Sequence, residues 1–149
     1  MRRMLQVIFG VAVLALPAWG ALGQSSDSVK ADRERLGGEL RSQEFTGYTV
    51  HEISQPGGHV VREYVSRAGV VFGVAWDGPT MPNLSQLLGT YFEQFQKAMS
   101  NSETPHRRGP VYVQAGPLVV ASGGHMRSFH GRAYLITMIP AGMTEAVVR

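Results

Sequence analysis

Three short runs of β-branched and aromatic residues between positions 48 and 76 constrain the fold of this chain most strongly. Val, Tyr, Phe and Trp fit the half-buried surface of a sheet, so we expect strands at residues 48–54, 59–66 and 70–76. Short turns rich in glycine separate them, at residues 55–58 and 66–69. Strands joined by such short turns predict an antiparallel meander.

The turns also predict how the strands pair. We expect Ile53 to lie opposite Val60, and Ser66 opposite Val70. In this register the two faces of the meander carry equal numbers of apolar side chains, so the sequence does not say which face is buried. A slip of one residue moves the side chains of a strand to the opposite face.

One amphipathic helix follows the meander, opened by Pro82 and by a capping pair formed by Asn83 and Gln86. Its apolar residues recur at steps of three and four positions, which places them on one side of the helix. These residues are Leu84, Leu87, Leu88, Tyr91, Phe92, Phe95, Ala98 and Met99. The stripe predicts packing against the sheet, and a groove for a cofactor is the alternative.

A second β region is expected at residues 111–114, 118–122, 125–129 and 132–139, punctuated by glycine turns. The predicted order is therefore a helix, three strands, an amphipathic helix and three or four strands. Runs of strands with few helices between them are typical of an α+β fold with a mostly antiparallel sheet.

The N-terminus has the pattern of a secretory signal peptide over residues 1–23. Two arginines precede an apolar run at residues 4–16, which is too short for the roughly 20 residues that a membrane span needs. We expect cleavage after Gly20, with Gly23 as the second choice, and a retained membrane anchor is the alternative. The chain is then exported to the periplasm or secreted, and no transmembrane span remains.

The rest of the chain has the length of one domain. We expect a polar helical lead-in at residues 24–44, a single α+β domain at 45–140 and a weakly patterned tail at 141–149. The chain has no cysteine, which excludes disulfides, thiolate catalysis and zinc–thiolate sites. Without the two arginines of the signal peptide, 12 Lys and Arg face 11 Asp and Glu, and this balance gives no argument for binding nucleic acid.

Residues that carry acid–base or metal chemistry are present but are not spaced in a known motif. No two of the five histidines have the spacing of a helical metal motif, so we expect surface histidines, no metal site and no cofactor. Ser122 and His125 flank a Gly-Gly turn, which hairpin geometry explains better than catalysis. Glu52 and Glu63 lie on neighbouring predicted strands, where we expect them to be solvated or paired with Arg62 or Arg41 rather than to act as a catalytic pair.

Two sets of residues are candidate binding surfaces. The first is cationic and suits an anionic partner, with an ordinary solvated patch as the alternative; it consists of His106, Arg107, Arg108, Arg127, His130 and Arg132. The second is an apolar pocket between the amphipathic helix and the sheet, lined by Tyr91, Phe92, Phe95 and Trp76.

Several sequence motifs carry a resemblance to a known family. They include Val61-Arg62-Glu63-Tyr64, Ala75-Trp76-Asp77-Gly78-Pro79-Thr80-Met81-Pro82, Ser122-Gly123-Gly124-His125-Met126 and Gly131-Arg132-Ala133-Tyr134. Through them the chain resembles small exported bacterial proteins grouped as domain of unknown function 2844. The resemblance implies an envelope or secreted location and brings no activity, cofactor or catalytic residue. The order of elements is also similar to small periplasmic modules of the PepSY and cystatin-like kinds, a likeness of fold that says little about function.

These observations favour a non-enzymatic interaction or binding module of the bacterial cell envelope. Its partner would be another envelope protein or an anionic envelope component. The first alternative is a periplasmic protein that binds a small ligand or lipid in an apolar pocket. The second is a small histidine-based metal protein or hydrolase.

Overall fold

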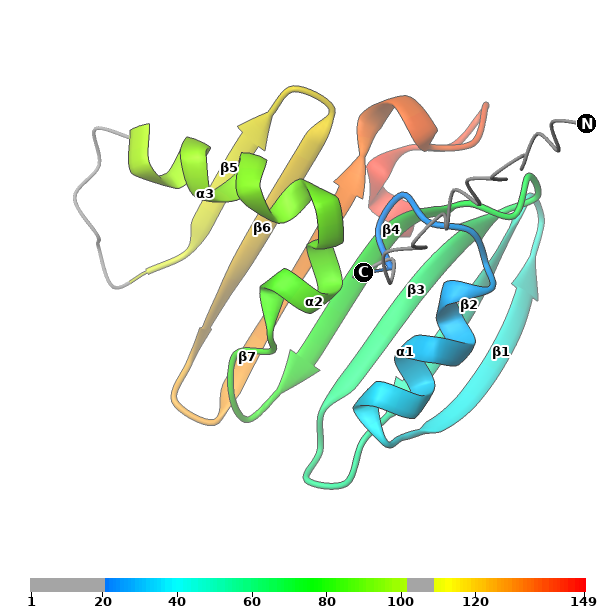
Figure 1. Ribbon diagram of the computed structural model, residues 1–149, viewed down its shortest axis with the longest axis horizontal. Coiled ribbons are helices and arrows are strands. Elements are labelled where there is room, and N and C mark those ends of the chain that lie inside the picture. Colours follow the sequence, from blue (N-terminus) through cyan, green and yellow to red (C-terminus); the bar gives the residue numbers. More distant parts are fainter. Residues whose placement is uncertain (1–20, 102–108) are drawn as a thin grey trace, which may run out of the picture.

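The computed structural model describes residues 21–101 and 109–149 and contains one seven-stranded sheet (Figure 1). The strands lie in the order β1-β2-β3-β4-β7-β6-β5, and each pairs with its neighbours in antiparallel fashion. This sheet confirms the predicted α+β class. The strands are β1 (Glu39–Phe45), β2 (Tyr48–Ser54), β3 (Val60–Ser66), β4 (Val71–Gly78), β5 (Val111–Ala115), β6 (Leu118–His125) and β7 (Ser128–Leu135).

The helices α1, α2 and α3 lie on one face of the sheet (Figure 1). Their bounds are α1 (Ser28–Leu36), α2 (Leu84–Leu88) and α3 (Phe92–Asn101), with the short 3-10 helices η1 (Gly89–Tyr91), η2 (Ile136–Met138) and η3 (Glu145–Val147). The amphipathic stripe is divided between α2 and α3, because Gly89 adopts a φ of 53° and ends α2. Asn83 caps α2 by accepting hydrogen bonds from the backbone N–H groups of Ser85 and Gln86.

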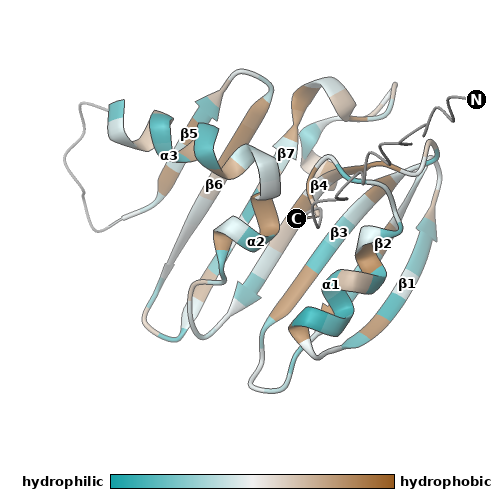
Figure 2. Cartoon of the chain, in the orientation of Figure 1, coloured by the Kyte–Doolittle hydropathy of each residue, from teal (hydrophilic) through white to brown (hydrophobic). Residues whose placement is uncertain are grey.

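The polar lead-in contains a strand as well as a helix. The helix α1 ends at Gly37, which adopts a left-handed φ of 65°, and the chain then forms β1 at the edge of the sheet. Six of the seven residues of β1 are exposed, and hydrophilic residues dominate it (Figure 2). The lead-in expected at residues 24–44 is therefore helical only up to Leu36. The strand β1 was not predicted, since a polar edge strand lacks the apolar alternation that identifies a strand.

The meander has a different register from the predicted one. Ile53 lies opposite Val61 instead of Val60, because the connection between β2 and β3 is one residue longer on the β3 side than we expected. The predicted pairing of Ser66 with Val70 is consistent with their backbone hydrogen bond of 2.9 Å. A β-bulge then shifts the β3–β4 pairing by one residue, between Tyr64 and Val65. Because of the changed β2–β3 register, the side chains of β3 lie on the opposite face of the sheet from the one that the prediction gave them.

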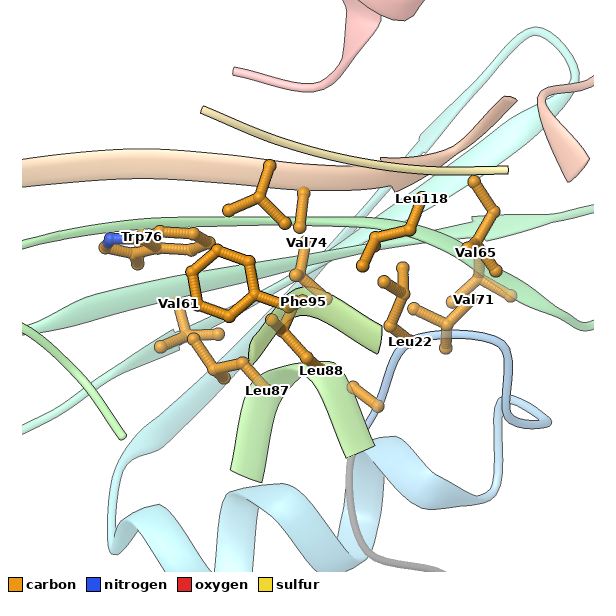
Figure 3. Close-up of a cluster of buried hydrophobic side chains, with 14 of the residues drawn as sticks. Leu22, Val61, Val65, Val71, Val74, Trp76, Leu87, Leu88, Phe95 and Leu118 are labelled. Atoms are coloured by element: carbon orange, nitrogen blue, oxygen red, sulfur yellow. The ribbon is translucent and has the colours of Figure 1, made fainter. Parts of the chain in front are cut away.

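Both faces of the sheet are partly covered. Under the helices lies a large apolar core, to which the sheet contributes Trp76 and Leu118 and the helices contribute Leu88 and Phe95 (Figure 3). Leu22 is also fully buried in this core, and the residues that follow it form backbone hydrogen bonds with the start of β4. No helix in residues 21–101 and 109–149 is long and apolar enough to cross a membrane.

The C-terminal residues cover the middle of the opposite face. Val148 is fully buried there among Tyr64, Phe72 and Tyr134. It fits above Gly73, where an added Cβ would lie 2.6 Å from Val148 Cγ2. The predicted weakly patterned tail at residues 141–149 is thus part of the domain. The predicted signal peptide stays a prediction, because residues 1–20 lie outside the described residues.

Candidate functional site

The structure describes half of the predicted cationic set. His106, Arg107 and Arg108 lie outside the described residues. Arg127 lies in the turn between β6 and β7 with a φ of 68°. His130 and Arg132 lie two positions apart on β7 and therefore on the same face of the sheet, the one that the helices leave free.

Arg132 has a structural partner. Its Nη1 donates to the carbonyl oxygens of Val148 at 3.0 Å and Glu145 at 3.4 Å. Its guanidinium lies over the ring of Tyr134, 5.8 Å from the ring centre. Arg132 therefore fastens the C-terminal segment to the sheet, and its donors are partly occupied.

The four residues of the predicted apolar pocket lie in or against the core. Trp76 and Phe95 are buried, and Tyr91 and Phe92 pack against the same cluster. Trp76 also lines a cleft of about 260 Å³ that runs between the end of α1 and the loop before α2. Tyr91, Phe92 and Phe95 do not line it, so the structure does not bring the four residues together around one cavity.

A cavity lies on the helix-free face, over β1, β2 and β3, and we call it the outer groove. It has a volume of about 520 Å³. It is lined by Arg41, Ser42, Gln43, Phe45, Tyr48, Val50, Glu52, Arg62, Tyr64, Val147 and Arg149. The C-terminal residues form one wall, and the three strands supply the rest.

Aromatic rings run across the outer groove. Phe45 stacks on its cross-strand partner Tyr48, with ring centres 5.0 Å apart and planes 9° apart. The ring centres of Tyr48 and Tyr64 are in turn 6.3 Å apart. The Tyr64 hydroxyl accepts a hydrogen bond from the backbone N–H of Arg149 at 3.0 Å and donates one to the carbonyl oxygen of the same residue. Tyr64 thereby connects the strands to the C-terminal wall.

A row of charged residues crosses the same face. Arg41 lies opposite Glu52, and Glu52 lies opposite Arg62. Arg62 Nε is 3.0 Å from Glu52 Oε2, and Arg62 Nη1 is 2.7 Å from Asp77 Oδ2. Burial alone would lower the pKa of Arg62, but the hydrogen bonds to Asp77 and Glu52 outweigh it and raise that pKa.

The other two arginines of the groove are not neutralised in this way. Within residues 21–101 and 109–149, neither Arg41 nor Arg149 has a carboxylate within 4.0 Å of its guanidinium. Counted together, the three arginines of the groove and the two acids Glu52 and Asp77 leave one net positive side-chain charge. The groove therefore offers guanidinium donors beside aromatic faces, an arrangement suited to a ligand with an anionic group.

The sheet also carries a serine, a histidine and an acid in one row. Ser42 Oγ and His51 Nδ1 are 2.7 Å apart, within hydrogen-bond distance. Glu63 lies opposite His51 on β3, but its carboxyl oxygens accept no hydrogen bond from His51. A hydrolytic triad requires the acid to bind the histidine, so this row does not have triad geometry. Burial lowers the pKa of His51.

Glu63 instead forms part of a buried acid pair that the sequence analysis missed. It is fully buried, and Asp32 of α1 is 3% exposed. Burial, followed by the neighbouring Asp32, raises the pKa of Glu63 to about 8. The sequence signal that could have revealed this pair is the position of Asp32, which lies on the same stripe of α1 as the apolar residues Val29 and Leu36. In the described part of the chain, no three His, Asp or Glu residues are grouped so that they could hold a metal ion.

Comparisons with known proteins identify a family for this chain. No curated protein and no solved structure matches the chain. A family profile matches residues 18–148, which include every strand, every helix and all but one residue of the outer groove. The chain therefore belongs to the DUF2844 family, described as proteins of unknown function.

Proposed function

We propose that this protein is an exported, non-enzymatic binding module of the bacterial cell envelope, and that its outer groove binds an anionic ligand. The observation that carries the proposal is the groove itself, about 520 Å³ in volume, with aromatic faces beside two guanidinium groups that have no carboxylate partner among the described residues. Export rests on the signal-peptide pattern of residues 1–23.

The charges of the groove favour an anion. Arg62 is held by Glu52 and Asp77, so it shapes the groove and is not free to bind. Arg41 lies on the exposed edge strand β1, opposite Glu52 of β2. Its guanidinium donors are available to a ligand. An arginine fork binds a carboxylate or a phosphate through two parallel hydrogen bonds, which makes Arg41 the expected contact for the anionic group.

The mixed lining favours a ligand that also has polar groups. Six of the eleven lining residues are polar or charged, and five are apolar or aromatic. A lipid carrier would need an enclosed apolar pocket, and small-ligand sites range from roughly 300 to 1,000 Å³. The outer groove has that volume but not that lining, and the cleft beside Trp76, at about 260 Å³, is smaller. These comparisons support a binding module over a lipid carrier.

The test is a calorimetric titration of the processed protein with three anionic probes: an oligogalacturonate, phosphatidylglycerol vesicles and a polyglutamate peptide. We expect at least one probe to bind in a salt-dependent way, and the Arg41→Gln variant to bind it about tenfold more weakly, a loss of about 1.4 kcal/mol. The matched control is Arg33→Gln, which removes the same charge from the exposed side of α1.

The outcome that would contradict the proposal is also defined. If no probe binds more tightly than a neutral counterpart, the groove is not an anion site. If the Arg41 and Arg33 variants lose affinity equally, the attraction is general and the outer groove is not its source.

A further inference from the structure

The helix α1 is attached to the sheet by a narrow stripe with an acid at its centre. Val29 is buried on this stripe, and Leu36 packs partly against the same core. Asp32 lies between them and is also buried. The other charged side chains of the helix, Lys30, Arg33, Glu34 and Arg35, are exposed. A carboxyl group therefore occupies a position where the pattern of the helix calls for an apolar residue.

The sheet presents a second carboxyl group beneath the helix. Glu63 projects from the middle of β3 and is fully buried. Its neighbours two positions away on the same face, Val61 and Val65, are buried as well. Two acids from distant parts of the sequence thus meet in an apolar surrounding.

We propose that Asp32 and Glu63 form a buried proton-binding site, in which one proton shared by the two carboxyl groups fastens α1 to the sheet. The two carboxyl groups lie within hydrogen-bond reach of each other, and no other described residue donates a hydrogen bond to their four oxygens. The buried Ser28 Oγ, one turn before Asp32, has no hydrogen-bond partner among these residues either. Two ionised carboxylates cannot supply a donor to each other, whereas one protonated carboxyl can. A single proton therefore gives both groups a hydrogen bond and removes one of two buried charges.

The groups facing the pair do not compensate a second negative charge. From α1, Arg35 Nη1 is 3.6 Å from Asp32 Oδ1, but the side chain of Arg35 is 38% exposed. From β2, His51 lies opposite Glu63, and burial favours its neutral form. From β4, the residue opposite is Val74. Since Arg35 favours the charge on Asp32, the proton belongs on Glu63.

The site makes folding depend on pH with a defined sign. Burial, followed by Asp32, raises the pKa of Glu63 to about 8 from an ordinary value of 4.5. The folded protein then keeps a proton that the unfolded chain releases, so stability falls as the pH rises from about 4.5 to about 8. One proton corresponds to a decrease in the folding constant of up to about tenfold for each pH unit.

The experiment compares wild type with Glu63→Gln between pH 5.5 and 8.5. The amide has the shape of a protonated carboxyl and donates to Asp32 without taking up a proton. The melting temperature of wild type should fall across this range, and the amides of α1 should lose protection from hydrogen exchange. The variant should show neither trend. Glu34→Gln, on the exposed side of α1, is the matched control and should behave as wild type does.

A second measurement needs no variant, in case Glu63→Gln fails to fold. Carbon NMR of the side-chain carboxyl groups in wild type should show Glu63 titrating several pH units above the other glutamates. A midpoint for Glu63 near its ordinary value would overturn the proposal. So would a Glu63→Gln protein whose stability kept the pH trend of wild type.

Discussion

Replacing Val148 with alanine tests whether the C-terminal segment is part of the fold and of the outer groove. Val148 is fully buried against the sheet. Its side chain fills the space above Gly73, where it would meet an added Cβ at 2.6 Å. Its carbonyl oxygen accepts a hydrogen bond from Arg132, a contact that the substitution leaves in place. The change therefore removes packing alone.

The size of the effect follows from the buried volume. Losing two buried methyl groups costs about 1.6 kcal/mol of transfer free energy, at about 0.8 kcal/mol each. The remaining cavity, at about 24 cal/mol per Å³ and some 40–50 Å³, adds about 1 kcal/mol. We expect the free energy of unfolding to fall by about 2.5 kcal/mol, and the melting temperature to fall by roughly 6–10 °C in a domain of this size.

Urea denaturation followed by circular dichroism measures the change, with an unchanged slope showing that both proteins unfold in the same way. Val147→Ala is the matched control, since Val147 is only partly buried and should cost less than about 1 kcal/mol. A Val148→Ala protein within about 0.5 kcal/mol of wild type would refute the reasoning, because surface substitutions have effects of that size. Equal losses in both variants would refute it too.

Two further predictions concern the helix-covered face. Gly131→Ala places a Cβ 2.3 Å from Trp76 Cζ2, so it should destabilise the protein by about 1–3 kcal/mol in the same urea assay; Gly123→Ala, whose Cβ would have ordinary contacts, should not. If the protein is exported as proposed, the mass of the processed chain should place its N-terminus at Ala21, because cleavage after Gly23 would remove the fully buried Leu22. A chain that begins at residue 24 would show that this residue is not needed in the core.

The apolar periodicities were sufficient to predict the class of fold. The stripe from Leu84 to Met99 identified the helical segment that covers the sheet, although Gly89 divides it. The glycine turns located the strands of the meander to within a few residues. The stripe and the turns can be read within a short stretch of sequence, because the spacing of apolar residues shows which side of a helix or strand is buried.

The missed features depend on contacts between distant parts of the chain. The edge strand β1 buries little, so its sequence reads as polar and only its pairing with β2 makes it a strand. The tail offers two adjacent valines, and nothing local shows that Val148 will meet Gly73. The outer groove requires both β1 and the tail, which is why no residue pattern predicted it.

The acid pair was missed for a related reason. The expected register placed Ile53 opposite Val60, and the error of one residue concealed which side chains of β3 face the helices. Glu63 was consequently expected in solvent or beside an arginine, the state that Glu52 has beside Arg62. Two glutamates on neighbouring strands thus have opposite environments, and only the register distinguishes them.

The most direct test of the proposed function is to map the binding surface by NMR. Amide shifts are recorded while the processed protein is titrated with the anionic probe that binds it most tightly. We expect the perturbed amides to cluster around Arg41, Tyr48 and Tyr64, on the strands that line the outer groove. Perturbations confined to α2, α3 and the cleft beside Trp76 would contradict the account, because they would place the binding site on the opposite face of the sheet.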